Sequence, residues 1–157
     1  YKRQALAYSF GAQVAEVEVD PATGAVTILK VTAAHDVGRA INPLAVEGQL
    51  DGQIFSGVSQ ILFEECRVEE GRILNPSRVD YKLPRAFELP EVERIIVETH
   101  DPHGPFGAKE VGEGPIVCTA QTIANAVSDA IGCPINEIPI TPERVLRALR
   151  KKRNTEK

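Results

Sequence analysis

A glycine-rich segment, His103 to Pro115, constrains the fold of this chain more than any other part of the sequence. It reads H-G-P-F-G-A-K-E-V-G-E-G-P and holds four glycines and two prolines. Glycine loses the most conformational entropy in a regular element and proline lacks a backbone donor, so this segment is predicted to be a loop. Such loops commonly bring a ligand or another stretch of backbone close to the main chain.

Glu113 is the residue of this loop with the clearest chemical potential. It lies between Gly112 and Gly114, immediately before a predicted helix. A carboxylate there faces the positive end of the helix dipole and the free N–H groups of the first turn. It could serve as a general base if a substrate proton came within hydrogen-bonding distance. A plain charge–dipole pairing is the alternative, and on physical grounds alone it is the better supported of the two.

Two familiar phosphate-binding motifs do not match this loop. Lys109 is not followed by the serine or threonine of a P-loop. Gly112 and Gly114 lack the third glycine of a dinucleotide-binding fingerprint. The loop therefore carries no sequence signature of nucleotide binding.

The histidines give weaker signals. His100 and His103, with Asp101 between them, could in principle bind zinc. Two histidines without further ligands favour a hydrogen-bonding role instead, and no metal site is predicted. His35 and Asp36, at the end of a predicted strand, are interpreted as structural.

Composition and charge restrict the class of protein. The chain has 157 residues, of which 43% are hydrophobic and 25% charged, as expected for one soluble globular domain or most of one. A net charge of −4 argues against a nucleic-acid partner. No apolar stretch approaches the roughly 20 residues of a membrane span. Three scattered cysteines favour a reducing, cytoplasmic compartment. The chain starts at Tyr1 and contains no methionine, so we interpret it as a piece of a longer polypeptide.

The order of the predicted elements indicates an α+β fold. Alternating and β-rich segments predict a hairpin over residues 12–34 and a further strand over 92–99. Helical spacing predicts helices over 43–62 and 116–131, and Thr141-Pro142 starts a last helix that reaches about Arg150. We expect a mixed or antiparallel sheet with a long helix after the first hairpin and two C-terminal helices.

A ridge of small residues lies along the first predicted helix. Gly48, Gly52 and Ser56 are spaced four apart and therefore share one face. Glycine inside a helix costs about 1 kcal/mol relative to alanine, so a close neighbour is expected. Another helix or a ligand could fill that place, and helix packing is the better-supported interpretation.

Taken together, the motifs resemble the molybdopterin-binding large subunit of the molybdenum hydroxylases, the xanthine dehydrogenase and aldehyde oxidoreductase family. The resemblance covers nearly the whole chain, in the order of the family's motifs. It rests on the segments A-Y-S-F-G-A-Q-V-A-E-V-E-V-D-P-A-T-G (7–24), A-H-D-V-G-R-A-I-N-P (34–43), V-E-G-Q-L-D-G (46–52), F-E-E (63–65), G-P-F-G-A-K-E-V-G-E-G (104–114), I-A-N-A-V-S-D-A-I-G (123–132) and I-T-P-E-R-V-L-R-A-L (140–149).

The resemblance implies roles for individual residues. Glu113 matches the active-site base in the family's G-x-x-x-V-G-E motif, and Gln49 matches a glutamine that hydrogen-bonds the molybdenum cofactor. Asp51 replaces the glutamate usual two positions after that glutamine. The loop backbone is implied to approach the cofactor, which makes the remaining cofactor-binding candidates Gly107, Ala108, Lys109 and Gly112. The glycine ridge would admit the pterin.

The resemblance also implies an activity and its partners. It implies residues 1–150 to be the C-terminal part of a molybdopterin-binding domain. Residues 151–157 are predicted from their basic and polar composition to be a disordered tail. The implied reaction hydroxylates an electron-poor carbon of a purine-like heterocycle or an aldehyde, with water as the oxygen source. The upstream part of the large subunit would share the molybdenum–molybdopterin cofactor, and iron–sulfur clusters and FAD would lie on other subunits or domains of a dimeric enzyme. Alone, the fragment would be metal-free and inactive. The alternative is a non-catalytic assembly module that binds no cofactor by itself.

Overall fold

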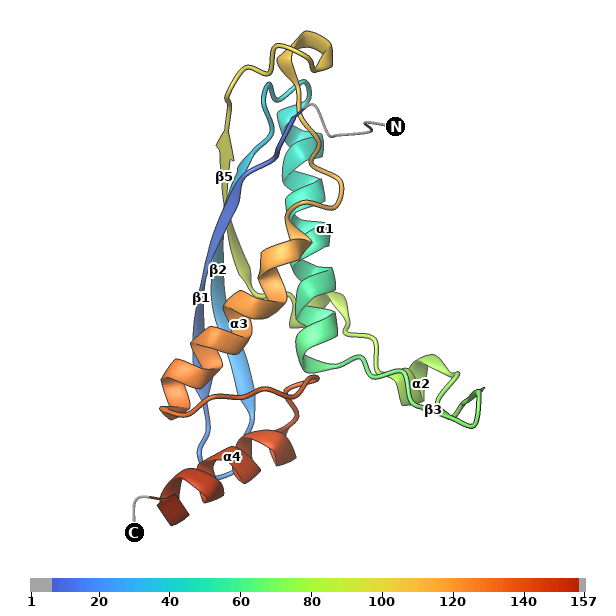
Figure 1. The fold of residues 1–157 in the computed structure, drawn as a ribbon, viewed down its shortest axis with the longest axis vertical. Helices are drawn as coiled ribbons and strands as arrows, with labels where there is room; N and C mark the ends of the chain where they lie inside the picture. Colours follow the sequence, from blue (N-terminus) through green and yellow to red (C-terminus); the bar gives the residue numbers. More distant parts are fainter. Residues whose placement is uncertain (1–6, 156–157) are drawn as a thin grey trace, which may run out of the picture.

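A mixed three-stranded sheet forms the centre of the computed structural model, which describes residues 7–155 (Figure 1). The strands are β1 (Gly11–Val19), β2 (Val26–Asp36) and β5 (Glu91–Val97), in the order β1-β2-β5. β1 pairs antiparallel with β2, whereas β5 runs parallel to β2. The predicted α+β class is thereby confirmed, and of the two expected sheet types, mixed or antiparallel, the observed one is mixed.

The turn of the β1–β2 hairpin is stabilised by its own side chains. Asp20 accepts hydrogen bonds from the Ala22 N–H (2.8 Å) and the Thr23 hydroxyl (2.7 Å). Gly24 follows with a φ of +77°, a conformation that suits glycine. The D-P-A-T-G signal in the sequence thus forms the turn it predicts.

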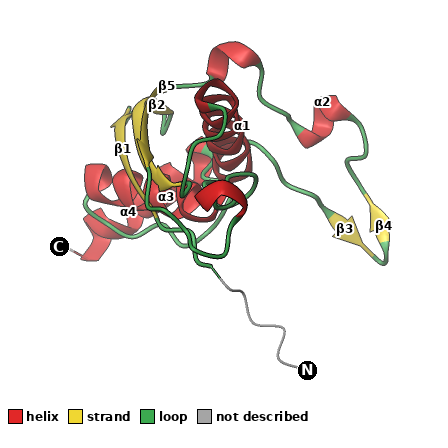
Figure 2. Ribbon diagram, turned by 90° about the horizontal axis from the view of Figure 1, so that it is seen from above, coloured by secondary structure: helices red, strands yellow, loops and turns green. Residues whose placement is uncertain are grey.

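Two helices, α1 (Pro43–Leu62) and α3 (Ile116–Ile131), cover one face of the sheet (Figures 1 and 2). The Asn42 side chain caps α1 by accepting the Ala45 N–H at 3.1 Å. The apolar stripe of α3 supplies Ile123 and Val127, which are fully buried. These helices join the sheet in one hydrophobic core, whose buried members are Val31, Ala33, Ile54, Val58, Ile61, Ile123, Val127, Ile131, Ile140 and Val145.

The last helix, α4 (Pro142–Thr155), is longer than predicted. Residues 151–155, interpreted from the sequence as part of a disordered tail, continue the helix. Lys152 donates to the carbonyl of Ile131 at 3.2 Å, so the added turns are tied to the end of α3. Residues 156–157 of the predicted tail lie outside the described residues, and the division of the chain near residue 150 stays a prediction.

An irregular excursion separates α1 from β5. It contains the two-stranded hairpin β3 (Val68–Glu69) and β4 (Arg72–Ile73), the short helix α2 (Arg78–Tyr81) and the 3-10 turn η1 (Ala86–Glu88). Figure 2 shows it extending away from the sheet and the long helices. A second 3-10 turn, η2 (Pro105–Gly107), lies in the glycine-rich loop. None of the helices within residues 7–155 is long and apolar enough to span a membrane.

Two of the three residues of the small-residue ridge, Gly48 and Gly52, do not meet another helix. Nothing in the described structure lies within 4 Å of a Cβ built on Gly48 or Gly52. It is Gly57 that makes the close approach, because a Cβ there would lie 2.5 Å from Thr119 on α3. The interpretation of the ridge as a helix-packing surface was therefore wrong for Gly48 and Gly52, whose side of the helix is open.

Candidate functional site

The glycine-rich loop connects β5 to α3 and passes the end of β2. Several backbone N–H groups in its first half already have partners within the chain. The N–H groups of Gly107 and Ala108 donate to the carbonyls of Gly104 and Pro105, both at 3.0 Å, and Lys109 N–H donates to Val37 at 2.8 Å. The backbone N–H groups of three predicted cofactor-binding residues, Gly107, Ala108 and Lys109, therefore already donate to carbonyls of this chain.

Two glycines allow this loop to lie against the end of β2. Gly38 and Gly107 have φ values of +66° and +85°. A Cβ on Gly38 would lie 2.3 Å from the carbonyl oxygen of Gly107. The sequence left open whether the loop glycines bring a ligand or another backbone close to the main chain. Here Gly38 admits the loop backbone, whereas Gly107 makes room for the side chain of His100.

A buried ion pair fastens the loop to β2. Lys109 Nζ lies 2.5 Å from Asp36 Oδ2 and 3.0 Å from Thr99 Oγ1. Burial alone would raise the pKa of Asp36. Hydrogen bonds from Lys109, Thr99 and the Gly38 N–H outweigh that effect and hold the pKa well below its usual range. The Lys109 side chain thus has a structural partner.

The carboxylate at the start of α3 belongs to Glu110. Its Oε2 accepts hydrogen bonds from the N–H groups of Glu113 (3.4 Å) and Gly114 (3.3 Å). Pro115 occupies the cap position and supplies no side-chain hydrogen bond. Glu110, three residues before Glu113, therefore hydrogen-bonds the backbone that leads into α3. The Glu113 carboxylate is exposed and makes no hydrogen bond or ion pair with the residues of the described chain.

A small apolar cluster brings the loop beside the first half of α1. Val111 packs against a buried cluster formed by Val37, Val46 and Leu50. Val46 and Leu50 lie on α1, on either side of Gln49 in the chain. Gln49 is exposed on that helix, and Gly112 and Glu113 are exposed on the loop. No described atom comes within 4 Å of a Cβ on Gly112, as for Gly48 and Gly52. The predicted site residues thus divide into an open set, Gln49, Gly112 and Glu113, and an internally bonded set, Gly107 to Lys109.

The hypothesis of a metal site at His100 and His103 has less support. Within residues 7–155, no three His, Cys, Asp or Glu side chains are grouped closely enough to hold a metal ion. His103 lies with Nδ1 3.9 Å from Asp101, and the His100 ring packs against Gly107. The zinc hypothesis therefore gains no third ligand.

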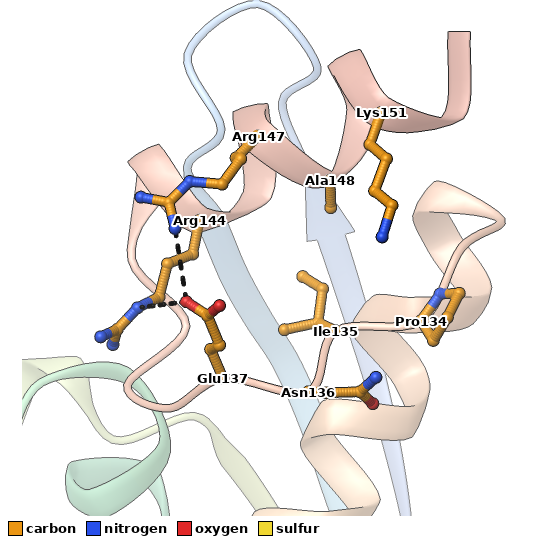
Figure 3. A pocket seen from close by; sticks show the side chains of 8 residues that line it. All are labelled: Pro134, Ile135, Asn136, Glu137, Arg144, Arg147, Ala148 and Lys151. Atoms are coloured by element: carbon orange, nitrogen blue, oxygen red, sulfur yellow. Dashed lines mark hydrogen bonds and ion pairs between the residues drawn. The ribbon is translucent and has the colours of Figure 1, made fainter. Parts of the chain in front are cut away.

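A cavity of about 210 Å³ lies at the α4 end of the molecule, away from the tip of the glycine-rich loop (Figures 1 and 3). Glu137 pairs there with Arg144 (3.4 Å) and Arg147 (3.5 Å). The lining is completed by Pro134, Ile135, Asn136, Ala148 and Lys151. It contains none of the predicted site residues, and its carboxylate, Glu137, is already paired with two arginines.

Comparison with known proteins agrees with the motifs. Residues 1–90 match the model of a family described as a molybdopterin cofactor-binding domain. The chain is 40% identical over 139 residues to the xanthine dehydrogenase molybdenum-binding subunit of Escherichia coli O157:H7, which covers 87% of this chain and 18% of that protein. It is 38% identical over 149 residues to the 6-hydroxypseudooxynicotine dehydrogenase complex subunit gamma of Paenarthrobacter nicotinovorans, covering 92% and 19%.

The chain is also similar to solved structures. The aldehyde oxidoreductase from Desulfovibrio gigas superposes with a TM-score of 0.84 at 35% identity, over 92% of this chain and 16% of that one. The chain therefore spans less than a fifth of the length of each of these three relatives.

Proposed function

This chain belongs to the molybdopterin-binding large subunits of the molybdenum hydroxylase family, and from that premise we propose that it supplies Glu113 as the general base of a hydroxylation reaction. The supporting observation is the position of its carboxylate. Glu113 is exposed on the loop, and Glu110 hydrogen-bonds the loop backbone at the start of α3. No described residue forms a hydrogen bond or an ion pair with the Glu113 carboxylate. A general base must be free to reach the proton it removes.

The open set of residues supports a contact with the cofactor better than the internally bonded set does. Gly48, Gly52 and Gly112 leave space where other residues would place a side chain. Gln49 lies on the same open helix with an amide that can donate and accept. We therefore propose Gln49 and the Gly112 backbone as contacts to the cofactor. The backbone donors of residues 107–109 and the Lys109 side chain are bonded within the protein, so their proposed role is to shape the loop.

The chemistry divides between cofactor and protein. When bound, the molybdenum cofactor supplies the redox chemistry that the side chains of this chain lack. Glu113 would accept a proton from the water that provides the oxygen atom, and Gln49 would hydrogen-bond the cofactor. The proposed substrate is an electron-poor heterocycle of the purine type or an aldehyde.

We propose that the rest of the large subunit completes the site, with iron–sulfur and FAD subunits as partners in a dimeric cytoplasmic enzyme. The short span of this chain relative to its relatives supports a shared site. Three free cysteines are consistent with a reducing compartment.

Glu113→Gln in the complete enzyme tests the proposed base. Turnover of the best substrate among a purine, a nicotinate-like ring and an aromatic aldehyde should fall at least about 100-fold while the molybdenum content stays constant. Oxygen-18 from labelled water should enter the wild-type product. Near-normal turnover in a cofactor-loaded variant would exclude Glu113 as the base.

Exposed apolar side chains support the second candidate, an assembly module that binds no cofactor by itself. Tyr8, Phe10, Leu44 and Phe106 are 69%, 68%, 78% and 79% exposed, as expected of a surface that meets further protein. The isolated chain should then contain no molybdenum by elemental analysis and show no turnover. Stoichiometric molybdenum in the isolated chain would exclude this candidate.

A further inference from the structure

His35 lies buried beneath the loop that carries Glu113. It is 3% exposed, yet its Nε2 has no hydrogen-bond partner among the described residues. The ring sits between two glycines: a Cβ on Gly11 would lie 3.0 Å from Nδ1, and a Cβ on Gly114 would lie 2.8 Å from Cε1. Buried polar atoms are nearly always paired, and an unpaired one costs about 1–3 kcal/mol. The position of this nitrogen therefore calls for an explanation.

The nearest charged group is the Glu110 carboxylate. Its Oε1 lies 3.8 Å from His35 Nε2. Its Oε2 accepts the N–H groups of Glu113 and Gly114, as described above. One carboxylate thus touches the buried ring on one side and the backbone of the proposed base on the other. A movement of about 1 Å would bring the ring nitrogen within normal hydrogen-bonding distance of Oε1.

The neighbouring contacts favour such a pairing. His35 and Asp36 are consecutive on β2, so their side chains point to opposite faces of the sheet. Lys109 and Glu110 are consecutive on the loop, and Lys109 already pairs with Asp36. The loop therefore crosses the end of β2 with one charged residue on each side, and Glu110 is the residue on the side of His35.

We propose that His35 is a positioning residue for Glu113, acting through Glu110. Nε2–H donates to Glu110, and Glu110 fixes the Glu113–Gly114 backbone at the start of α3. The consequence for catalysis rests on the proposed role of Glu113 as the base. The mechanical link from His35 to the backbone does not depend on that role.

Two variants of His35 in the complete enzyme test the link. His35→Leu removes the donor, whereas His35→Gln keeps an N–H group near the position of Nε2. In His35→Leu, the amides of Glu113 and Gly114 should exchange hydrogen at least about tenfold faster, and kcat should fall roughly 10- to 100-fold at similar KM, as expected for a misplaced group. His35→Gln should restore most of both losses. His103→Gln, at an exposed histidine of the same loop, should change neither.

Glu110→Ala provides a second route if a His35 variant does not fold, because the Glu110 side chain is 53% exposed. It should give the same faster exchange, and His35→Leu combined with Glu110→Ala should be no worse than either change alone. Unchanged exchange at Glu113 and Gly114 in both single variants would overturn the proposal, as would equal losses in His35→Leu and His35→Gln. If Glu113→Gln kept its turnover while the exchange effects held, only the proposed function would fail.

Discussion

Lys109 and Asp36 form an ion pair between groups 73 positions apart in the chain, with side chains only 10% and 6% exposed. The pair joins the glycine-rich loop to the end of β2. Both charges are largely removed from water, so each is stabilised mainly by the other. The pair therefore holds the loop in one position against β2.

Removing one member of this pair should loosen the loop. Lys109→Met leaves the Asp36 carboxylate buried without its cation, at a cost of about 3–5 kcal/mol. Hydrogen exchange over residues 98–110 of the complete large subunit should become much faster. Combining Lys109→Met with Asp36→Asn should recover part of the protection, because no unpaired charge remains. If Lys109 instead served the cofactor, Lys109→Met would lower the molybdenum content and leave the exchange of the loop unchanged.

The same pair predicts a dependence on pH. The folded-state pKa of Asp36 is depressed by its hydrogen bonds, so its stabilising contribution is present above the unfolded pKa of about 4. It is lost as the pH falls from there through the folded-state pKa. Protection factors of loop amides should therefore stay constant from about pH 7 to pH 5 and decrease below about pH 4. Asp36→Asn should lack this acid step, and an identical step in that variant would assign it to another group.

The two kinds of glycine on α1 should respond differently to substitution. Gly57→Ala places a methyl group 2.5 Å from Thr119 and should destabilise the α1–α3 contact by roughly 1–3 kcal/mol. Gly52→Ala meets no described atom and should stabilise α1 by about 0.5–1 kcal/mol through helix propensity. Hydrogen exchange of the α1 and α3 amides measures both. Equal effects at the two positions would contradict the packing described above.

Gln49 should matter for cofactor retention and not for folding. Gln49→Leu removes an exposed amide on the open side of α1, and its loss should weaken cofactor binding about tenfold, the equivalent of one hydrogen bond. The measurement is molybdenum per large subunit after dialysis. Gln60→Leu, at another exposed glutamine of α1, is the matched control and should retain the wild-type content. Equal molybdenum in both variants would remove Gln49 from the proposed site.

Asn75 should hold the excursion between α1 and β5. It is 2% exposed, accepts the Arg67 N–H at 3.0 Å and donates to the Glu65 carbonyl at 2.6 Å. Asn75→Ala leaves both backbone groups unpaired, a cost of about 1–3 kcal/mol. Amides of residues 64–81 should exchange faster, while Asn136→Ala, at an exposed asparagine, should leave them unchanged.

Periodicity and capping residues predicted the regular elements well. The apolar stripe of α3 predicted residues 116–131, and Asn42-Pro43 predicted the start of α1, because both signals are local in the chain. The end of α4 was predicted too early. The basic, polar residues after Arg150 look like a tail in sequence, but the bond from Lys152 to Ile131 is a tertiary contact.

The candidate site likewise has features that the sequence predicts and features that only tertiary contacts reveal. Sequence alone established the loop, its glycines, the motif around Glu113 and the family resemblance, because each lies in a short run of residues whose spacing carries the information. The tertiary structure decided which groups are bonded within the protein and which stay open. Glu110 hydrogen-bonds the backbone before α3, and the N–H groups of residues 107–109 donate to carbonyls of this chain, whereas Gln49, Gly112 and Glu113 are left open. Such assignments depend on the end of β2, some 70 residues away in the chain, because hydrogen bonds and buried charges are satisfied by neighbours in space, which one sequence read in order does not display.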